Sequence, residues 1–213
     1  MARIRPAVLT ALLSGAAVVG YVSYRLFVGA GPEVVPETIQ FGEAPSASAD
    51  ADAPSQLAEH LPEFSLENLA GAQQSIASWP GKPLLINFWA TWCGPCLREI
   101  PMLKELQARR PDVQVVGIAV DRRDPVLGFS TSMQFNYPIL IGENGGWDAA
   151  AAFGVNVYAL PFTVFTAADG SVLGVHTGEL HPEQLEDLTA VLDDLKAGKI
   201  DLVTARARIA GRI

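Results

Sequence analysis

Two cysteines stand three residues apart in the run Trp92-Cys93-Gly94-Pro95-Cys96, and they are the only cysteines among 213 residues. A thiolate at one position of such a pair can attack a disulfide, and the second thiol can then resolve the mixed disulfide and release the product. The pair therefore predicts a dithiol that cycles between thiol and disulfide. Apart from this Cys93–Cys96 disulfide, no cofactor is predicted.

Three other uses of a cysteine pair compete with this interpretation. A zinc site needs about four ligands, and His176 and His181, which could complete one, lie 80 residues beyond Cys96, against the usual dozen or so. Covalent haem attachment needs a histidine directly after the second cysteine, where this chain has Leu97. A purely structural disulfide across a two-residue loop recovers little chain entropy. The exchange dithiol is favoured, and no metal site is predicted.

The segments on either side of the pair explain why it would react. Residues 84–89 (LLINFW) are typical of a buried strand, and residues 96–109 have helical apolar spacing, with Pro101 expected to kink the helix. The strand would deliver Cys93 to the helix N-terminus, where free backbone N–H groups and the macrodipole favour a thiolate. Pro95 suits a helix start, and Gly94 leaves room for a substrate chain.

The rest of the domain is predicted to alternate strands and helices. Residues 113–120 form a second buried strand, and an Asp-Gly turn joins strands at 162–166 and 171–175. Residues 182–196 form an amphipathic helix with proline in its first turn. Residues 124–153 are expected to insert a helix, a strand and a helix. The pattern predicts an α/β sandwich around a mixed sheet.

Composition excludes several classes of protein. Hydrophobic residues make up 49% of the chain and charged residues 18%, which is incompatible with a wholly disordered chain. Two cysteines cannot build a small secreted scaffold stapled by disulfides. The net charge of −8 argues against nucleic acid as a partner, because such a surface must neutralise phosphates.

Four segments are predicted along the chain. Residues 1–30 contain 19 consecutive uncharged residues from Pro6 to Tyr24, which favours a membrane-spanning helix, since a span needs about 20 apolar residues. Residues 31–57, rich in Ala, Pro, Ser and acids, form a flexible tether. Residues 58–200 form the folded domain. Residues 201–213 form a short basic tail, with Arg206, Arg208 and Arg212 on a solvated helix end.

The first segment also suggests an orientation. Arg3 and Arg5 precede the apolar run and acids follow it, which favours an N-terminus in the cytoplasm and a folded domain outside it. In a two-membrane bacterium the outside compartment would be the periplasm. A cleaved signal peptide is the alternative, because Val28-Gly29-Ala30 is an acceptable small-residue cleavage site.

The chain resembles a known family. Residues 87–101 (NFWATWCGPCLREIP) look like the active-site segment of TlpA/ResA-like thiol–disulfide oxidoreductases of the thioredoxin superfamily. Residues 61–66 (LPEFSL) resemble the first strand of that family, and residues 160–163 (LPFT) resemble its cis-proline loop. The resemblance covers roughly residues 58–196, including the central insertion. It implies a thioredoxin-like sandwich.

The resemblance also implies roles for individual residues. Cys93 would be the attacking thiolate and Cys96 the resolving thiol. Glu99 matches an acidic residue that manages protons near the pair, a role that thioredoxin gives to a buried Asp at the position of Asn87. Pro161 would be cis, and its loop with Leu160 would offer backbone groups to an extended substrate. Trp92 would shape the docking surface.

The function implied is a membrane-tethered, extracytoplasmic disulfide reductase. Its partners would be disulfides of client proteins, such as apocytochrome c or metal-site thiols, and an integral-membrane thiol transporter as electron donor. An oxidase or isomerase would use the same residues, because the motif determines the chemistry better than its direction. A non-catalytic binding module on the same fold is the second alternative, against which the retention of both cysteines argues.

Overall fold

The computed structural model describes residues 56–156 and 159–211. The predicted anchor at 1–30 and nearly all of the predicted tether lie outside these residues. Within the described ranges, no helix combines the length and the apolar character needed to cross a bilayer. The anchor therefore remains a prediction from sequence.

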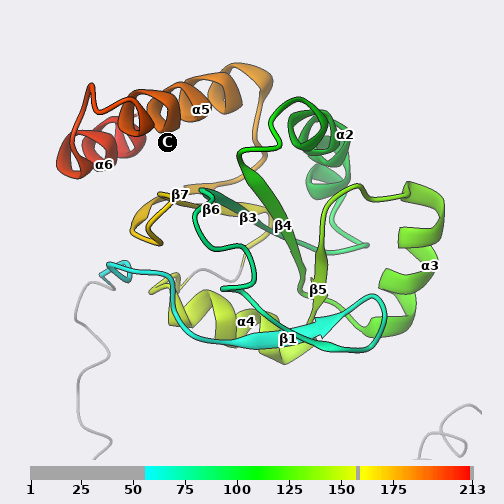
Figure 1. Ribbon diagram of the computed structural model, residues 1–213. Coiled ribbons are helices and arrows are strands. Elements are labelled where there is room, and N and C mark those ends of the chain that lie inside the picture. Colours follow the sequence, from blue (N-terminus) through cyan, green and yellow to red (C-terminus); the bar gives the residue numbers. More distant parts are fainter. Residues whose placement is uncertain (1–55, 157–158, 212–213) are drawn as a thin grey trace, which may run out of the picture. The chain divides into compact units, whose positions relative to one another are not determined.

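Seven strands form one mixed sheet in the order β2-β1-β5-β4-β3-β6-β7 (Figure 1). In chain order the strands are β1 (Ser65–Asn68), β2 (Gln73–Ser75), β3 (Leu84–Trp89), β4 (Gln114–Ala119), β5 (Ile139–Ile141), β6 (Phe162–Thr166) and β7 (Val172–Thr177). Strands β3, β4 and β5 are parallel to one another, whereas β1 runs antiparallel to β5 and β6 antiparallel to β3. The sheet is mixed, as predicted.

Five described helices cover the two faces of this sheet. They are α2 (Gly94–Arg109), α3 (Arg123–Met133), α4 (Glu143–Ala152), α5 (Pro182–Lys196) and α6 (Leu202–Ala210). Buried side chains of α2, α3, α5 and α6 join one hydrophobic core, and those of α4 join the other. The predicted sandwich is confirmed, and α3, β5 and α4 form the predicted insertion.

Most predicted elements lie where expected. Strand β6 and helix α5 have the predicted bounds, and α2 continues through Pro101 without ending there. The first strand differs, because it begins at Ser65, after most of the run 61–66 that suggested it. Pro62 in that run has no N–H to donate to a sheet.

The described part of the predicted basic tail is a helix on which Arg208 is exposed, as predicted, but whose other face is buried. Ala205 and Ile209 of α6 are fully buried in the core beneath the helix. Arg206 donates to the carbonyl oxygens of Val172 and Glu59, at 2.8 and 3.0 Å. Two apolar residues four positions apart form a one-sided stripe, which was too short to stand out beside three arginines. Helix α6 is therefore part of the fold.

The side chains of β3 alternate between the two faces of the sheet, and this alternation positions the residues beneath α2. Leu85 and Trp89 belong to the core under α2, whereas Ile86 and Phe88 belong to the core on the opposite face. Asn87 therefore points toward α2, since successive side chains of a strand point to opposite faces. This alternation places a polar amide beneath the helix that carries Cys96.

Candidate active site

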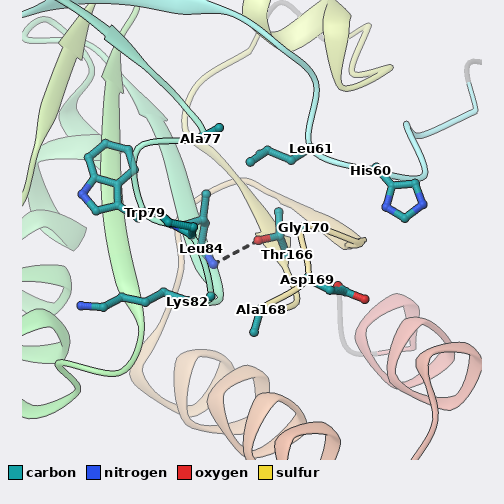
Figure 2. A pocket seen from close by; sticks show the side chains of 12 residues that line it. His60, Leu61, Ala77, Trp79, Lys82, Leu84, Thr166, Ala168, Asp169 and Gly170 are labelled. Atoms are coloured by element: carbon teal, nitrogen blue, oxygen red, sulfur yellow. Dashed lines mark hydrogen bonds between the residues drawn. The ribbon is translucent and has the colours of Figure 1, made fainter.

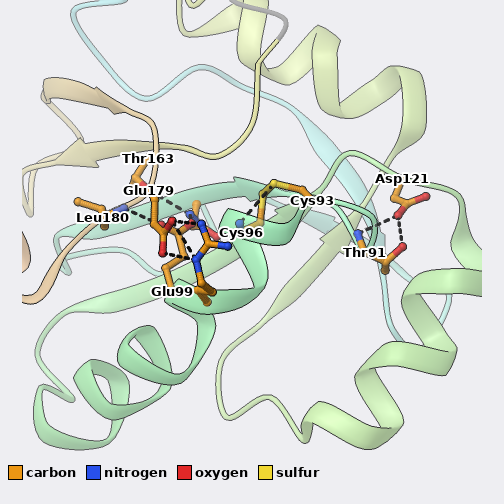
Figure 3. The surroundings of a disulfide bond; sticks show 10 residues. Thr91, Cys93, Cys96, Glu99, Asp121, Thr163, Glu179 and Leu180 are labelled. Atoms are coloured by element: carbon orange, nitrogen blue, oxygen red, sulfur yellow. Dashed lines mark hydrogen bonds and ion pairs between the residues drawn. A yellow bond between two sulfur atoms is a disulfide. The ribbon is translucent and has the colours of Figure 1, made fainter.

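Cys93 and Cys96 form a disulfide at the point where the chain passes from β3 into α2 (Figure 3). Cys93 is the N-cap residue of α2, and its sulphur accepts a hydrogen bond from the Cys96 N–H at 3.3 Å. Pro95 occupies the first turn, where no backbone N–H is needed. In the reduced protein the same N–H would stabilise a thiolate on Cys93.

The two sulphurs differ in access. Cys93 is 5% exposed and Cys96 is completely buried, while Gly94 between them is exposed. Trp92 next to the pair is 69% exposed, an unusual position for so large an apolar side chain. These exposures agree with attack on Cys93 from outside and with Trp92 as part of a docking surface.

The loop before β6 lies at the same end of the sheet. Phe162 of β6 pairs with Phe88 of β3 in antiparallel register, so residues that precede β6 emerge where β3 ends. The peptide bond between Leu160 and Pro161 is cis, as the resemblance implied. Pro161 is buried and Leu160 half-buried. The structure thus brings Leu160 and Pro161 to the edge that carries the disulfide.

Glu99 lies one helical turn beyond Cys96 and is only 2% exposed. Asn87 donates its Nδ2 to Glu99 Oε1 at 2.6 Å and to Thr163 Oγ1 at 3.1 Å. The Leu180 N–H donates to Glu99 Oε2 at 2.9 Å (Figure 3). Glu99 is therefore a buried carboxyl group, and Asn87, which takes the position of thioredoxin's buried Asp, is its direct partner.

The proton affinity of the Glu99 carboxyl group is strongly increased. Burial raises the pKa of Glu99 from 4.5 to about 7, against the hydrogen bonds from Leu180 and Asn87, which favour the ionised form. Burial, together with the nearby Glu99 carboxylate, also raises the pKa of Tyr137. A carboxyl group that titrates near neutral pH can both accept and donate a proton under physiological conditions.

Sequence reasoning missed a further contact beside the pair. Asp121, just after β4, accepts hydrogen bonds from the Thr91 N–H at 2.9 Å and from the Thr91 hydroxyl at 2.5 Å (Figure 3). This buried carboxylate fixes the loop that leads from β3 to Cys93. The only sequence signal for this contact was the position of Asp121, directly after a predicted buried strand.

A pocket lies at the opposite end of the sheet from the disulfide. It has a volume of about 270 Å³ and is lined by His60, Trp79, Leu84, Asp169 and neighbouring residues (Figure 2). Leu84 begins β3, and its N–H donates to the Thr166 hydroxyl at 3.0 Å. Because β3 runs its whole length from Leu84 to the loop that carries Cys93, this pocket is separate from the dithiol. Among the described residues, no cluster of three or more His, Cys, Asp or Glu side chains could hold a metal ion.

Comparison with known proteins places this arrangement in a family. The family model described as Redoxin matches residues 56–192, which is more than half of the chain. The chain belongs to the Redoxin family. This Redoxin-family chain is 32% identical over 136 residues to thioredoxin-like protein YneN of Bacillus subtilis, across 62% of this chain and 77% of YneN.

Two other relatives extend the comparison. The Redoxin-family chain is 30% identical over 137 residues to thiol-disulfide oxidoreductase ResA of Halalkalibacterium halodurans, across 63% of this chain and 76% of ResA. A crystal structure of a thiol:disulfide interchange protein from Chlorobium tepidum superposes with a TM-score of 0.51 at 30% identity, across 61% of this chain and 90% of that one.

These matches confirm the TlpA/ResA-like resemblance and the thioredoxin-like fold. The Redoxin-family protein is a thiol–disulfide oxidoreductase with a Cys-x-x-Cys pair. The relatives match the part of the chain that contains the disulfide, and residues 1–55 lie outside the matched family model.

Proposed function

We propose that this protein is a disulfide reductase that acts outside the cytoplasm, tethered to the membrane by residues 1–30. The observation that carries the direction of the reaction is the buried Glu99 carboxyl one turn from Cys96. In this proposal Cys93 attacks a client disulfide, Cys96 resolves the mixed disulfide, and Glu99 exchanges protons with the pair.

Electrostatics favours reduction over oxidation. A strong oxidant of this fold, at about −120 mV, owes its potential to a stabilised reduced form, whereas thioredoxin lies at about −270 mV. Ionised Glu99 would oppose a second negative charge on the nearby cysteines and so destabilise the thiolate. The Gly94-Pro95 dipeptide, which matches that of thioredoxin, supports the same direction.

The proposed partners follow from the family resemblance and the predicted anchor. Client proteins would present disulfides formed from cysteines that must be kept reduced in an oxidising compartment, such as the cysteines of apocytochrome c or of metal-delivery sites. The electrons would come from an integral-membrane thiol transporter. The exposed Trp92 and the cis-proline loop at 160–161 would hold an extended client chain.

The reduction potential tests the direction. We expect the Cys93–Cys96 couple to equilibrate with glutathione or dithiothreitol near the thioredoxin end of the range, at roughly −250 mV or below. A potential near about −120 mV would instead support the oxidase alternative. Catalysed reduction of insulin by dithiothreitol is expected as well, and a protein that binds insulin without accelerating its reduction would be a binding module.

The anchor is tested on the native protein. Because 19 uncharged residues follow two arginines, we expect the mature chain to keep its N-terminus and to sediment with membranes. A protease added outside intact spheroplasts should digest the catalytic domain. N-terminal sequencing that finds a start at Gly31 would show a signal peptide in place of an anchor.

A further inference from the structure

The loop after β7 contacts the active site at consecutive residues. The Gly178 N–H donates to the carbonyl oxygen of Pro161 at 2.9 Å, which joins the loop to the cis-proline segment. The Leu180 N–H donates to Glu99 Oε2. Between them, the Glu179 carboxylate forms an ion pair with Arg98 of α2.

Arg98 and Glu179 form a two-point ion pair. The guanidinium donates from Nε to Glu179 Oε1 at 2.9 Å and from Nη2 to Oε2 at 2.5 Å. The Arg98 side chain is 64% exposed and that of Glu179 is 21% exposed. Arg98 directly precedes Glu99, and Glu179 directly precedes Leu180. The ion pair therefore joins the same two segments as the buried hydrogen bond, one residue away on each side.

We propose that the Arg98–Glu179 ion pair is a positioning device, which clamps the loop at 178–180 onto α2 and so holds the Leu180 N–H on the Glu99 carboxylate. The inference rests on the proposed function, in which Glu99 exchanges protons with the cysteines. An exposed ion pair by itself stabilises a protein little. A bidentate arginine, however, restricts orientation, and orientation is what the amide-to-carboxylate bond requires.

The clamp and a purely electrostatic effect predict opposite shifts of the Glu99 pKa when Glu179 is removed. The Leu180 N–H favours ionised Glu99, so loss of this hydrogen bond while the carboxyl stays buried should raise the pKa of Glu99 whichever partner is removed. Charge alone would act differently, because removing the negative Glu179 would lower that pKa. The effect of removing Glu179 therefore separates a clamp from an electrostatic neighbour.

The other titratable groups near Glu99 are the same in the wild type and in variants of Arg98 or Glu179. They are Tyr137, which senses the Glu99 charge, His176, whose Nε2 lies 3.3 Å from the Glu179 carbonyl oxygen, and the cysteines on its own helix. The groups facing Glu99 from β3 and β6, Asn87 and Thr163, do not titrate. Measurement on the oxidised protein removes the cysteines from the titration.

The test uses the oxidised full chain with ¹³C-labelled glutamate carboxyls. We expect Arg98→Ala and Glu179→Ala each to raise the Glu99 midpoint by about one pH unit, and to speed hydrogen exchange of the Leu180 amide about tenfold. Arg109→Ala is the matched control, since it breaks the Arg109–Glu105 pair on the exposed side of the same helix. It should change neither quantity.

The results separate this proposal from the proposed function. A Glu99 midpoint that falls in Glu179→Ala, or that stays unchanged in Arg98→Ala, would overturn the clamp. Because the midpoint is measured without turnover, it is independent of catalysis. If both midpoints rise but Glu99→Gln turns over normally, the clamp stands and the proton-exchange role of Glu99 fails.

Discussion

Replacing Cys96 with serine is expected to leave client proteins covalently attached to Cys93. The fully buried Cys96 is the only other cysteine in the chain, so no second thiol can attack the mixed disulfide. Turnover of insulin should fall to the background rate. Non-reducing electrophoresis should show adducts that disappear on reduction, and mass spectrometry of these adducts would identify the clients.

The matched variant is Cys93→Ser, which keeps the buried thiol and removes the accessible one. It should also lose turnover but should accumulate no adducts, because Cys96 is shielded from a client chain. Equal adduct formation by the two variants, or faster alkylation of Cys96 than of Cys93 in the reduced protein, would reverse the assigned order of the cysteines.

The second large effect concerns Glu99→Gln. In the reduced wild type, the rate of Cys93 alkylation against pH should carry a second inflection near 7, which belongs to Glu99 and the cysteines together. The variant should lose this inflection, and its disulfide turnover should fall roughly 10²-fold, the lower range for loss of a positioned acid–base group. Wild-type turnover with an unchanged profile would assign the proton to another group.

The same substitution has a stability signature in the oxidised protein. Folding raises the pKa of Glu99 from 4.5 to about 7, so the folded state holds a proton that the unfolded state releases between these values. The free energy of unfolding should therefore fall by about 3 kcal/mol as the pH rises through this window. The free energy of unfolding of Glu99→Gln, measured with urea, should not fall over this pH range. Above this range the variant should therefore be more stable than the wild type.

The side-chain amide introduced by Glu99→Gln has a hydrogen-bond acceptor available nearby. Oδ1 of Asn87 is buried and has no hydrogen-bond partner among the residues that the structure describes. Rotation of the Asn87 amide would present this oxygen to a glutamine at position 99. Glu105→Gln, on the exposed side of α2, is the control and should keep the pH dependence of the wild type. A stability profile of Glu99→Gln that matches the wild type would contradict the raised pKa.

Local sequence was sufficient for the reactive pair and the elements that carry it. A buried strand at 84–89, two cysteines and an amphipathic helix are signals within one stretch, and the structure places Cys93 at the helix N-cap they imply. The bounds of β6 and α5 were also predicted, because proline, Asp-Gly and apolar periodicity act over a few residues. The cis state of Pro161 came from the family resemblance.

The environment of the pair depends on the order of the strands. Glu99 meets Leu180, 81 residues away, only because β3 pairs with β6 and β6 with β7, which returns the chain to α2. The Arg98–Glu179 ion pair spans the same separation. Helix α6 packs through one short stripe, Ala205 and Ile209, which was not recognised among the arginines of the predicted basic tail.

Sequence alone therefore determined which atoms exchange electrons, since spacing of three residues at a strand–helix junction defines a dithiol. The tertiary structure decided how protons are handled there. Burial and the partners Asn87 and Leu180 set the pKa of Glu99, and Leu180 comes from a segment 81 residues away in the chain. Hydrophobic periodicity encodes which side of an element is buried, but not which distant backbone N–H will face a carboxylate across the core.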